Sequence, residues 1–171
     1  ADSFIAAKKE GLLEPYKSKN SAGIAANFKD PEGYWTGIYQ GYLGFILDNR
    51  FFEERKLALP KSWNDLLKPE LKGQIIVANP GSAGTAYTVL STLVQLKGEQ
   101  EALKYMGQLH KQIKQYTKAG EAPARSAALG EAAVGITFIH NGIRLIKEGY
   151  TNLKLSVPED GTGYEVGAVG I

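Results

Sequence analysis

The turn Asn79-Pro-Gly-Ser-Ala-Gly-Thr85 offers the clearest binding chemistry in this sequence. It lies between an apolar run at residues 74–79, typical of a buried strand, and a helical pattern that opens at Ser82 or Gly84. The first amides of a helix are unpaired and carry a partial positive charge, and the two glycines would let a ligand approach the backbone. The alternative is that Ser82 only caps the helix, and the residues alone weigh both roles equally. The predicted anion-binding residues are Ser82, Ala83, Gly84 and Thr85.

A second candidate position is His140-Asn141, which follows the apolar run 133–139 and begins a helical pattern at 141–149. An imidazole there could donate a hydrogen bond to a phosphate, phosphonate or carboxylate. The Asn141 amide would add a directional hydrogen bond. The alternative for His140 is a structural role as a helix cap or at the edge of the core.

Aromatic residues gather in the segment 34–49, where Tyr34, Trp35, Tyr39 and Tyr42 could form a wall of a ligand cleft. For any single ring, packing within the core is the favoured alternative. Tyr39 is the residue of this group that we expect to contact a ligand. Two further candidate contacts are Thr117, after a short predicted strand, and Tyr164, near the last strand.

The sequence has few motifs that would indicate catalysis or metal binding. Ser82 is not in a nucleophile elbow, because residue 80 is proline instead of glycine, and no Gly-x-x-x-x-Gly-Lys-Ser/Thr loop is present. The sequence has two histidines and no cysteine, and they show no metal-ligand spacing. We therefore predict no catalytic residue, no metal and no cofactor.

The elements that must position these residues alternate along the chain. Predicted strands lie at 74–79, 115–117, 133–139 and 153–157. Predicted helices lie at 99–112, 122–129 and 141–149, and another opens at Ser82 or Gly84 and carries an apolar stripe up to Val94. A first segment at Asp2–Leu13 with a short helix that Gly11 breaks, a long strand or strand pair at 34–49 and a final strand at 164–171 complete the pattern. This alternation predicts a three-layer α/β fold, flavodoxin-like in outline, with a mostly parallel sheet and helices on both faces.

Composition narrows the classes of partner. The 171 residues are 43% hydrophobic and 22% charged, which is enough to bury a core, and the formal net charge is only +2. No run of like charges indicates binding to nucleic acid. No apolar stretch approaches the ~20 residues of a membrane span, and no signal peptide is visible in this chain.

Six short motifs follow one another along the chain in an order that is known from other proteins. Together they cover nearly the whole chain. This order resembles the type II periplasmic (extracellular) solute-binding proteins of bacterial ABC transporters, of the ferric-ion and 2-aminoethylphosphonate-binding kind. The motifs are Gly11–Tyr16, Phe28–Trp35, Pro60–Leu67 with Pro69–Gly73, Ala78–Thr85, Ala128–Ala133 and Val157–Tyr164.

The resemblance implies two lobes that close on a solute. Residues 1–33 would be a remnant of lobe one, 34–49 the outgoing hinge strands, 50–158 lobe two and 159–171 the returning hinge strand. The chain would then hold half of a site for a small polar or anionic solute, in a periplasmic or extracytoplasmic receptor. Its implied partners are the missing lobe one and the membrane permease of the importer.

One difference between this sequence and the family bears on the identity of the solute. In the ferric-binding members of the family that this sequence resembles, the corresponding stretch has two adjacent tyrosines whose phenolates bind iron. Gly142-Ile143 occupies that place here. A hard ferric ion needs anionic oxygen ligands, which neither residue supplies. The sequence therefore argues against bare iron.

Two other interpretations stay open. The chain could be a truncated or engineered half-receptor without ligand function, whose terminal segments exchange between copies to form a homodimer. It could instead be a stand-alone flavodoxin-like hydrolase that uses Ser82. Oligomeric state discriminates the first of these interpretations, and ester turnover discriminates the second.

Overall fold

The computed structural model describes residues 2–171 and divides into two compact units. The larger unit is Tyr42–Gly163, and the smaller one consists of the chain up to Gly41 together with Tyr164–Ile171. One boundary falls inside the long strand β1 (Thr36–Asp48), and the other falls at the start of β6 (Tyr164–Val169). The predicted crossing segments 34–49 and 159–171 thus contain both boundaries. Their action as hinges stays a prediction.

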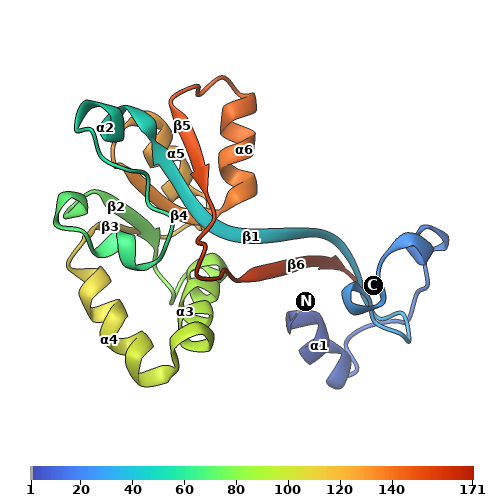
Figure 1. Ribbon diagram of the computed structural model, residues 1–171. Coiled ribbons are helices and arrows are strands. Elements are labelled where there is room, and N and C mark those ends of the chain that lie inside the picture. The colour runs from blue at the N-terminus through green and yellow to red at the C-terminus, as the bar shows by residue number, and fades with distance from the viewer. Residues whose placement is uncertain (1) are drawn as a thin grey trace. The chain divides into compact units, whose positions relative to one another are not determined.

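The larger unit is an alternation of strands and helices (Figure 1). After β1, its strands are β2 (Ile75–Ala78), β3 (Ile113–Thr117), β4 (Val134–Phe138) and β5 (Leu153–Ser156). Its helices are α2 (Asn49–Glu54), α3 (Gly84–Lys97), α4 (Glu99–His110), α5 (Ala122–Leu129) and α6 (Ile139–Lys147), with short 3-10 helices at Asn64–Leu67 and Pro69–Leu71.

The strand order of the sheet is β3-β2-β4-β1-β5. Strand β2 pairs in parallel with both β3 and β4, whereas β1 runs antiparallel to β4 and β5. The carboxyl ends of β2, β3 and β4 therefore meet at one edge, which we call the carboxyl edge. The predicted three-layer, mostly parallel α/β fold is confirmed.

Helices cover both faces of this sheet. Phe45 and Leu47 of β1 point into a core shared with α3 and α4, and Ile46 between them points into a second core shared with α5 and α6. This alternation follows from the two-residue period of a strand. In Figure 1, α3 and α4 lie below the sheet of this unit, and α5 and α6 lie above it.

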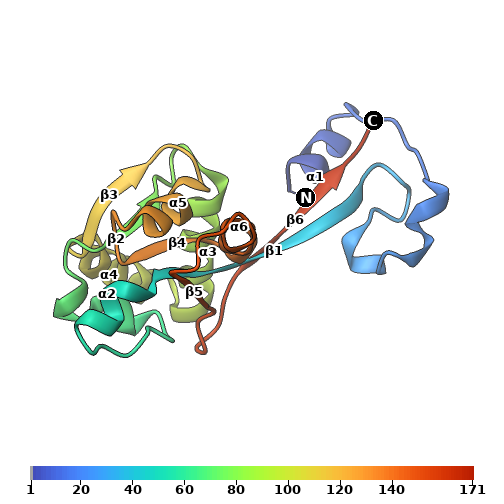
Figure 2. The ribbon, with the colours of Figure 1, turned by 90° about the horizontal axis from the view of Figure 1, so that it is seen from above.

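The smaller unit contains α1 (Asp2–Lys9), 3-10 helices at Lys19–Gly23 and Ala26–Phe28, and β6, which pairs with β1. Figure 2 shows α1 beside β6, and just beyond α1 the amide of Glu14 donates to the carbonyl of Ile171 at 2.7 Å. Helix α1 ends at Lys9, just before the residue where the sequence predicts a break. The reason is Gly11, whose φ of +67° is left-handed, and the amide of Leu12 closes the helix end by donating to Ala7.

In the described part of the chain, no helix has the length and apolar character needed to cross a membrane.

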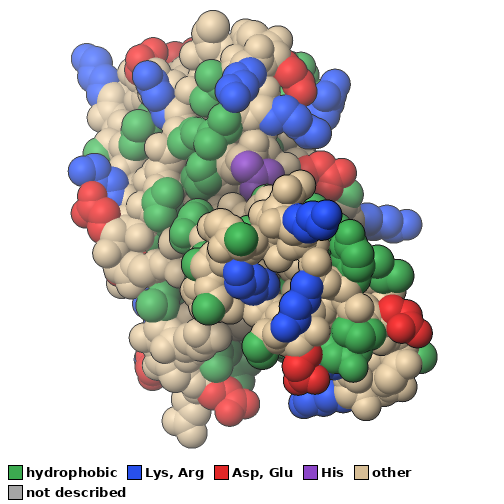
Figure 3. Space-filling model, turned by 90° about the vertical axis from the view of Figure 1, so that its right-hand side faces the viewer, with side chains coloured by type: hydrophobic (Ala, Val, Ile, Leu, Met, Phe, Trp, Pro, Cys, Tyr) green, Lys and Arg blue, Asp and Glu red, His purple; other side chains and the backbone are tan. Residues whose placement is uncertain are grey.

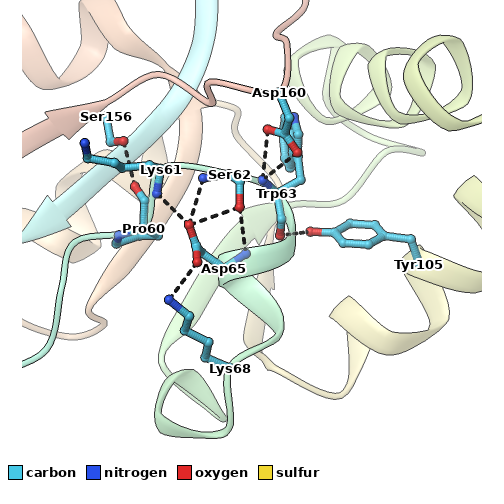
Figure 4. Close-up of polar contacts among 9 residues, drawn as sticks. All are labelled: Pro60, Lys61, Ser62, Trp63, Asp65, Lys68, Tyr105, Ser156 and Asp160. Carbon is cyan, nitrogen blue, oxygen red and sulfur yellow. Dashed lines mark hydrogen bonds and ion pairs between the residues drawn. The ribbon is translucent and has the colours of Figure 1, made fainter.

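A polar network around Trp63 fixes the segment that leads into β6 (Figure 4). The backbone amide of Trp63 donates to the carboxylate of Asp160 at 3.2 and 3.3 Å, and its indole N–H donates to the carbonyl of Gly161 at 3.0 Å. The buried hydroxyl of Tyr105, from α4, donates to the carbonyl of Trp63. Burial raises the pKa of Tyr105, so this hydroxyl stays a donor. The network joins three segments that are distant in sequence.

Asp65 should make the stability of this unit sensitive to acid. Its hydrogen bond from Lys68, at 2.6 Å, lowers its pKa to about 2 from 3.8, with further support from the Lys61 and Ser62 amides at 3.0 Å. A lowered native pKa stabilises the fold above about pH 4, and this stabilisation is lost as the pH falls towards 2. Urea unfolding should show Asp65→Asn less stable than the parent at pH 7, with the difference becoming steadily smaller as the pH falls from about 4 to 2.

The control for Asp65 is the exposed Glu70 nearby. We expect Glu70→Gln to change the free energy of unfolding by less than about 0.5 kcal/mol at every pH, as surface substitutions usually do. An Asp65→Asn difference that stays constant from pH 7 to pH 2 would contradict the role given to this carboxylate.

Gly135 should be intolerant of a side chain, because a Cβ there would lie 2.2 Å from the carbonyl oxygen of Pro123. Helix α5 packs directly on β4 at this point. In contrast, Gly107 in α4 has open space at its Cβ position. Thermal unfolding should show Gly135→Ala destabilised, by roughly 1–3 kcal/mol. Gly107→Ala should be stabilised by about 0.5–1 kcal/mol, as in other helices.

Candidate ligand-binding site

Two turns and the junction between β4 and α6 meet at the carboxyl edge, and hydrogen bonds join them. The amide of Asn79, after β2, donates to the carbonyl of Thr117 at the end of β3, at 2.8 Å. The hydroxyl of Ser82 donates to the carbonyl of Lys118 at 3.2 Å and to that of Asn79 at 3.3 Å. The predicted turn before α3 is thus fixed to the turn that follows β3.

The N-terminus of α3 carries no side-chain cap. Its N-cap residue is Ala83, and the Ser82 hydroxyl bonds elsewhere, so the alternative that Ser82 caps this helix is wrong. The amides of Ser82 and Ala83 both donate to the carbonyl of Asn79 at 3.0 Å. Within residues 2–171, the amides of Gly84 and Thr85 have no backbone acceptor. Of the four predicted anion-binding residues, these two have backbone donors left for a ligand.

Gly120 shapes the neighbouring turn, and sequence reasoning missed it. A Cβ at Gly120 would lie 2.2 Å from the hydroxyl oxygen of Thr85, so the two turns touch only because residue 120 is glycine. A glycine between a predicted strand and a predicted helix was the available signal. Thr117, a predicted ligand contact, uses its hydroxyl within this turn, donating to Ala119 at 2.9 Å.

The junction between β4 and α6 is connected to these turns through Thr137, which sequence reasoning also missed. This residue of β4 is fully buried, and its hydroxyl donates to the carbonyl of Gly120 at 2.7 Å. The side-chain amide of Asn141, in the first turn of α6, donates to the same hydroxyl oxygen at 3.0 Å. Thr137 therefore connects the turn after β3 to the start of α6.

His140 is exposed at the start of α6, and its ring stacks on Phe138 with 5.6 Å between ring centroids and 17° between planes. The next residue but one, Gly142, is buried: a Cβ there would lie 2.5 Å from Leu155 and 2.6 Å from Ile46. Helix α6 therefore packs closely on the sheet at the position where the resemblance implies a tyrosine in ferric-binding proteins.

Tyr39 and Tyr164 belong to the smaller unit. The hydroxyl of Tyr39 donates to Glu165 at 3.4 Å, and the charge of this carboxylate raises the pKa of Tyr39. The Tyr39 ring lies over Gly167 of β6, where a Cβ would come within 1.9 Å. Tyr164 is about half exposed at the start of β6. The structure thus brings together Ser82–Thr85, Thr117, His140 and Asn141, all in the larger unit.

The surface charge of the protein contributes little to the attraction of an anion. Figure 3 shows Lys and Arg side chains interspersed with Asp and Glu on the face in view, consistent with the net charge of +2. Long-range attraction is therefore weak, and selectivity at the carboxyl edge depends on local groups. At the α3 N-terminus these groups are oriented amides and the positive end of the helix dipole.

Comparisons with known proteins agree on one family. A family model described as bacterial extracellular solute-binding protein matches residues 1–168. A protein of Haemophilus influenzae without an assigned function is 45% identical over 166 residues, covering 94% of this chain and 48% of that protein. The Fe(3+)-binding periplasmic protein of Serratia marcescens is 25% identical over 127 residues, covering 74% of this chain and 36% of that protein.

Among solved structures, the periplasmic binding protein AfuA from Actinobacillus pleuropneumoniae, with exogenous fructose-6-phosphate bound, superposes with a TM-score of 0.85 at 43% identity. This match covers 95% of the present chain and 52% of AfuA. The chain spans about half the length of AfuA and of the Haemophilus protein, and about a third of the length of the Serratia protein. Since the family model matches nearly every residue, the chain belongs to the bacterial extracellular solute-binding proteins, the type II periplasmic receptors that its motifs resemble.

Proposed function

We propose that this chain is the second lobe of an ABC-importer receptor and that its carboxyl edge holds the phosphate group of a small phosphorylated sugar. The observation that carries the proposal is the uncapped N-terminus of α3, where the amides of Gly84 and Thr85 have no backbone acceptor within residues 2–171. Backbone amides at a helix N-terminus are a common binding site for phosphate groups. The space at the Cβ position of Gly84 is open, so a ligand can approach this backbone closely.

The choice of a sugar phosphate rests on two further points. AfuA, at 43% identity over 95% of this chain, has been solved with fructose-6-phosphate bound. A sugar phosphate combines an anionic group with hydroxyls, which suits an edge that offers amide donors at α3 and polar side chains at His140 and Asn141. Bare ferric iron fits poorly, because Gly142 and Ile143 supply no anionic oxygen.

Binding without chemistry is the mode we propose for this edge. The hydroxyl proton of Ser82 is directed at two backbone carbonyls, those of Asn79 and Lys118. A nucleophilic serine needs a base that accepts this proton, and a carbonyl oxygen is not such a base. The closed receptor would then deliver the unchanged solute to the membrane permease, outside the cytoplasm.

The smaller unit supports the proposal that further chain completes lobe one. It exposes several large apolar side chains, among them Leu12 (68%), Ile38 (63%) and Ile171 (67%). It also has a hollow of about 390 Å³ with an apolar lining that includes Tyr16, Trp35, Ile38 and Val169. Apolar surface of this kind is normally covered by a partner segment. The full-length receptor would supply that segment from its own lobe one.

The same exposed surface makes the 171-residue chain prone to self-association, through exchange of terminal segments between two copies. Light scattering coupled to size exclusion should show a dimer that forms as the chain concentration rises. Ile38→Ser, which removes an apolar side chain from the hollow, should shift the equilibrium towards monomer, whereas Leu103→Ser on α4 of the other unit should not. Monomer at every concentration would contradict the exchange and leave the binding proposal intact.

Titration of the 171-residue chain with fructose 6-phosphate, followed by ¹H–¹⁵N NMR, tests the binding proposal. We expect weak binding, since only half of the site is present, with the largest shifts at the Gly84 and Thr85 amides. Unphosphorylated fructose and ferric citrate should leave these signals in place. Binding of fructose 6-phosphate that leaves both amides unmoved would contradict the site.

A pair of glycine variants sharpens the test of the binding site. Gly84→Ala and Gly107→Ala both place a methyl group in open space on a helix, so both should fold normally. Only Gly84→Ala puts the methyl beside the binding amides, and it should weaken fructose 6-phosphate binding by about tenfold, near the value of one charge-assisted hydrogen bond. Equal affinities for the two variants would place the phosphate elsewhere.

A further inference from the structure

Thr137 is a buried polar residue in a strand that is otherwise apolar. It is fully buried in β4, and its hydroxyl makes two hydrogen bonds that join different turns of the carboxyl edge. One partner is the carbonyl of Gly120 at 2.7 Å, and the other is the side-chain amide of Asn141 at 3.0 Å. A buried hydroxyl of this kind fixes the orientation of the groups that it bonds.

The orientation of Asn141 follows from counting protons. A carbonyl oxygen can only accept, so the single hydroxyl proton of Thr137 must go to Gly120. The Thr137 oxygen can then only accept from Asn141, and only Nδ2 of Asn141 can donate. This assignment leaves Oδ1 as the remaining group of the side chain, and no donor within residues 2–171 bonds to it.

We propose that Thr137 is a positioning residue that holds Asn141 with Oδ1 as an acceptor for a hydroxyl of the solute, and so selects polyhydroxy phosphate esters over phosphate esters without a hydroxyl. The inference rests on the proposed function, which supplies the phosphate at α3. The two parts of the site have opposite hydrogen-bonding polarity: the amides of Gly84 and Thr85 donate, whereas Oδ1 of Asn141 accepts. A phosphate dianion offers only acceptors, so it satisfies the first part and not the second.

The same geometry explains why an amide suits position 141. A carboxylate there would need the Thr137 proton for itself, in competition with the carbonyl of Gly120. Asn141→Asp would therefore leave either the carbonyl of Gly120 or the new carboxylate without a donor, and the Thr137 oxygen would lose the donor that it has from Asn141. It would also place a negative charge at an edge that binds an anion. Asparagine is the side chain of this size that can donate to Thr137 and still present an acceptor.

The test compares fructose 6-phosphate with methyl phosphate at pH 8, where each carries a dianionic phosphate and only the sugar has hydroxyls. The ratio of the two Kd values, measured by NMR titration of the 171-residue chain, is the selectivity. Thr137→Val removes the hydroxyl and keeps the shape, so fructose 6-phosphate should bind about tenfold more weakly while methyl phosphate binds as before. Thr137→Ser keeps the hydroxyl and should keep the selectivity.

Two further measurements separate positioning from loss of the fold. The side-chain NH₂ signals of Asn141 should move in Thr137→Val and stay in place in Thr137→Ser, because one of these protons is bonded to residue 137. Asn141→Ala alters no buried residue of the core, and it should lose the same selectivity as Thr137→Val even if the valine variant unfolds.

The outcomes are distinct for the two proposals. If the unaltered chain binds both esters and Asn141→Ala keeps the selectivity, the role given to Thr137 and Asn141 is wrong and the phosphate site stands. Binding of neither ester by the unaltered chain contradicts the proposed function and this assignment together.

Discussion

The parallel pairing of β2 with both β3 and β4 is the constraint on which the candidate site depends. It places the ends of three strands, at Ala78, Thr117 and Phe138, at one edge of the sheet, although these residues are distant from one another in sequence. The pairing needs helix α5 to lie tightly on β4, and Gly135 allows this because a side chain there would meet the carbonyl of Pro123. A residue that never touches solvent thus determines where Ser82, Gly120 and Asn141 can lie.

Few bonds hold these turns together, and they differ in character. The link from Ser82 to Lys118 is exposed, whereas the link from Gly120 through Thr137 to Asn141 is buried at its centre. Water competes for the first and not for the second, so the second contributes more to a fixed geometry. The α3 N-terminus is left uncapped, and a missing cap costs about 1 kcal/mol. Such a cost is expected where a ligand, and not a side chain, completes the helix end.

The sequence was informative wherever one local pattern determined the structure. The apolar run 74–79 followed by Pro80-Gly81 predicted β2 and its turn, and the ordered motifs predicted the family. The sequence could not identify the N-cap residue of α3. The Ser82 hydroxyl bonds to Lys118, which lies on another turn, and no local pattern indicates this bond. Thr137 is β-branched, and such residues are common in strands. Its partner Gly120 is distant in sequence, so no local pattern indicated that its hydroxyl joins two segments.

Packing and ligand chemistry change together at the start of α6. Gly142 brings this helix close to Ile46 and Leu155, and a larger residue there would require these side chains or the helix to shift. That close approach is what puts Asn141 within 3.0 Å of Thr137. A tyrosine at position 142 would therefore add a phenolate and also displace the amide that Thr137 orients. Under the role proposed for Asn141, the same stretch of α6 that lacks ligands for a hard cation would present an oriented acceptor for a hydroxyl of the solute.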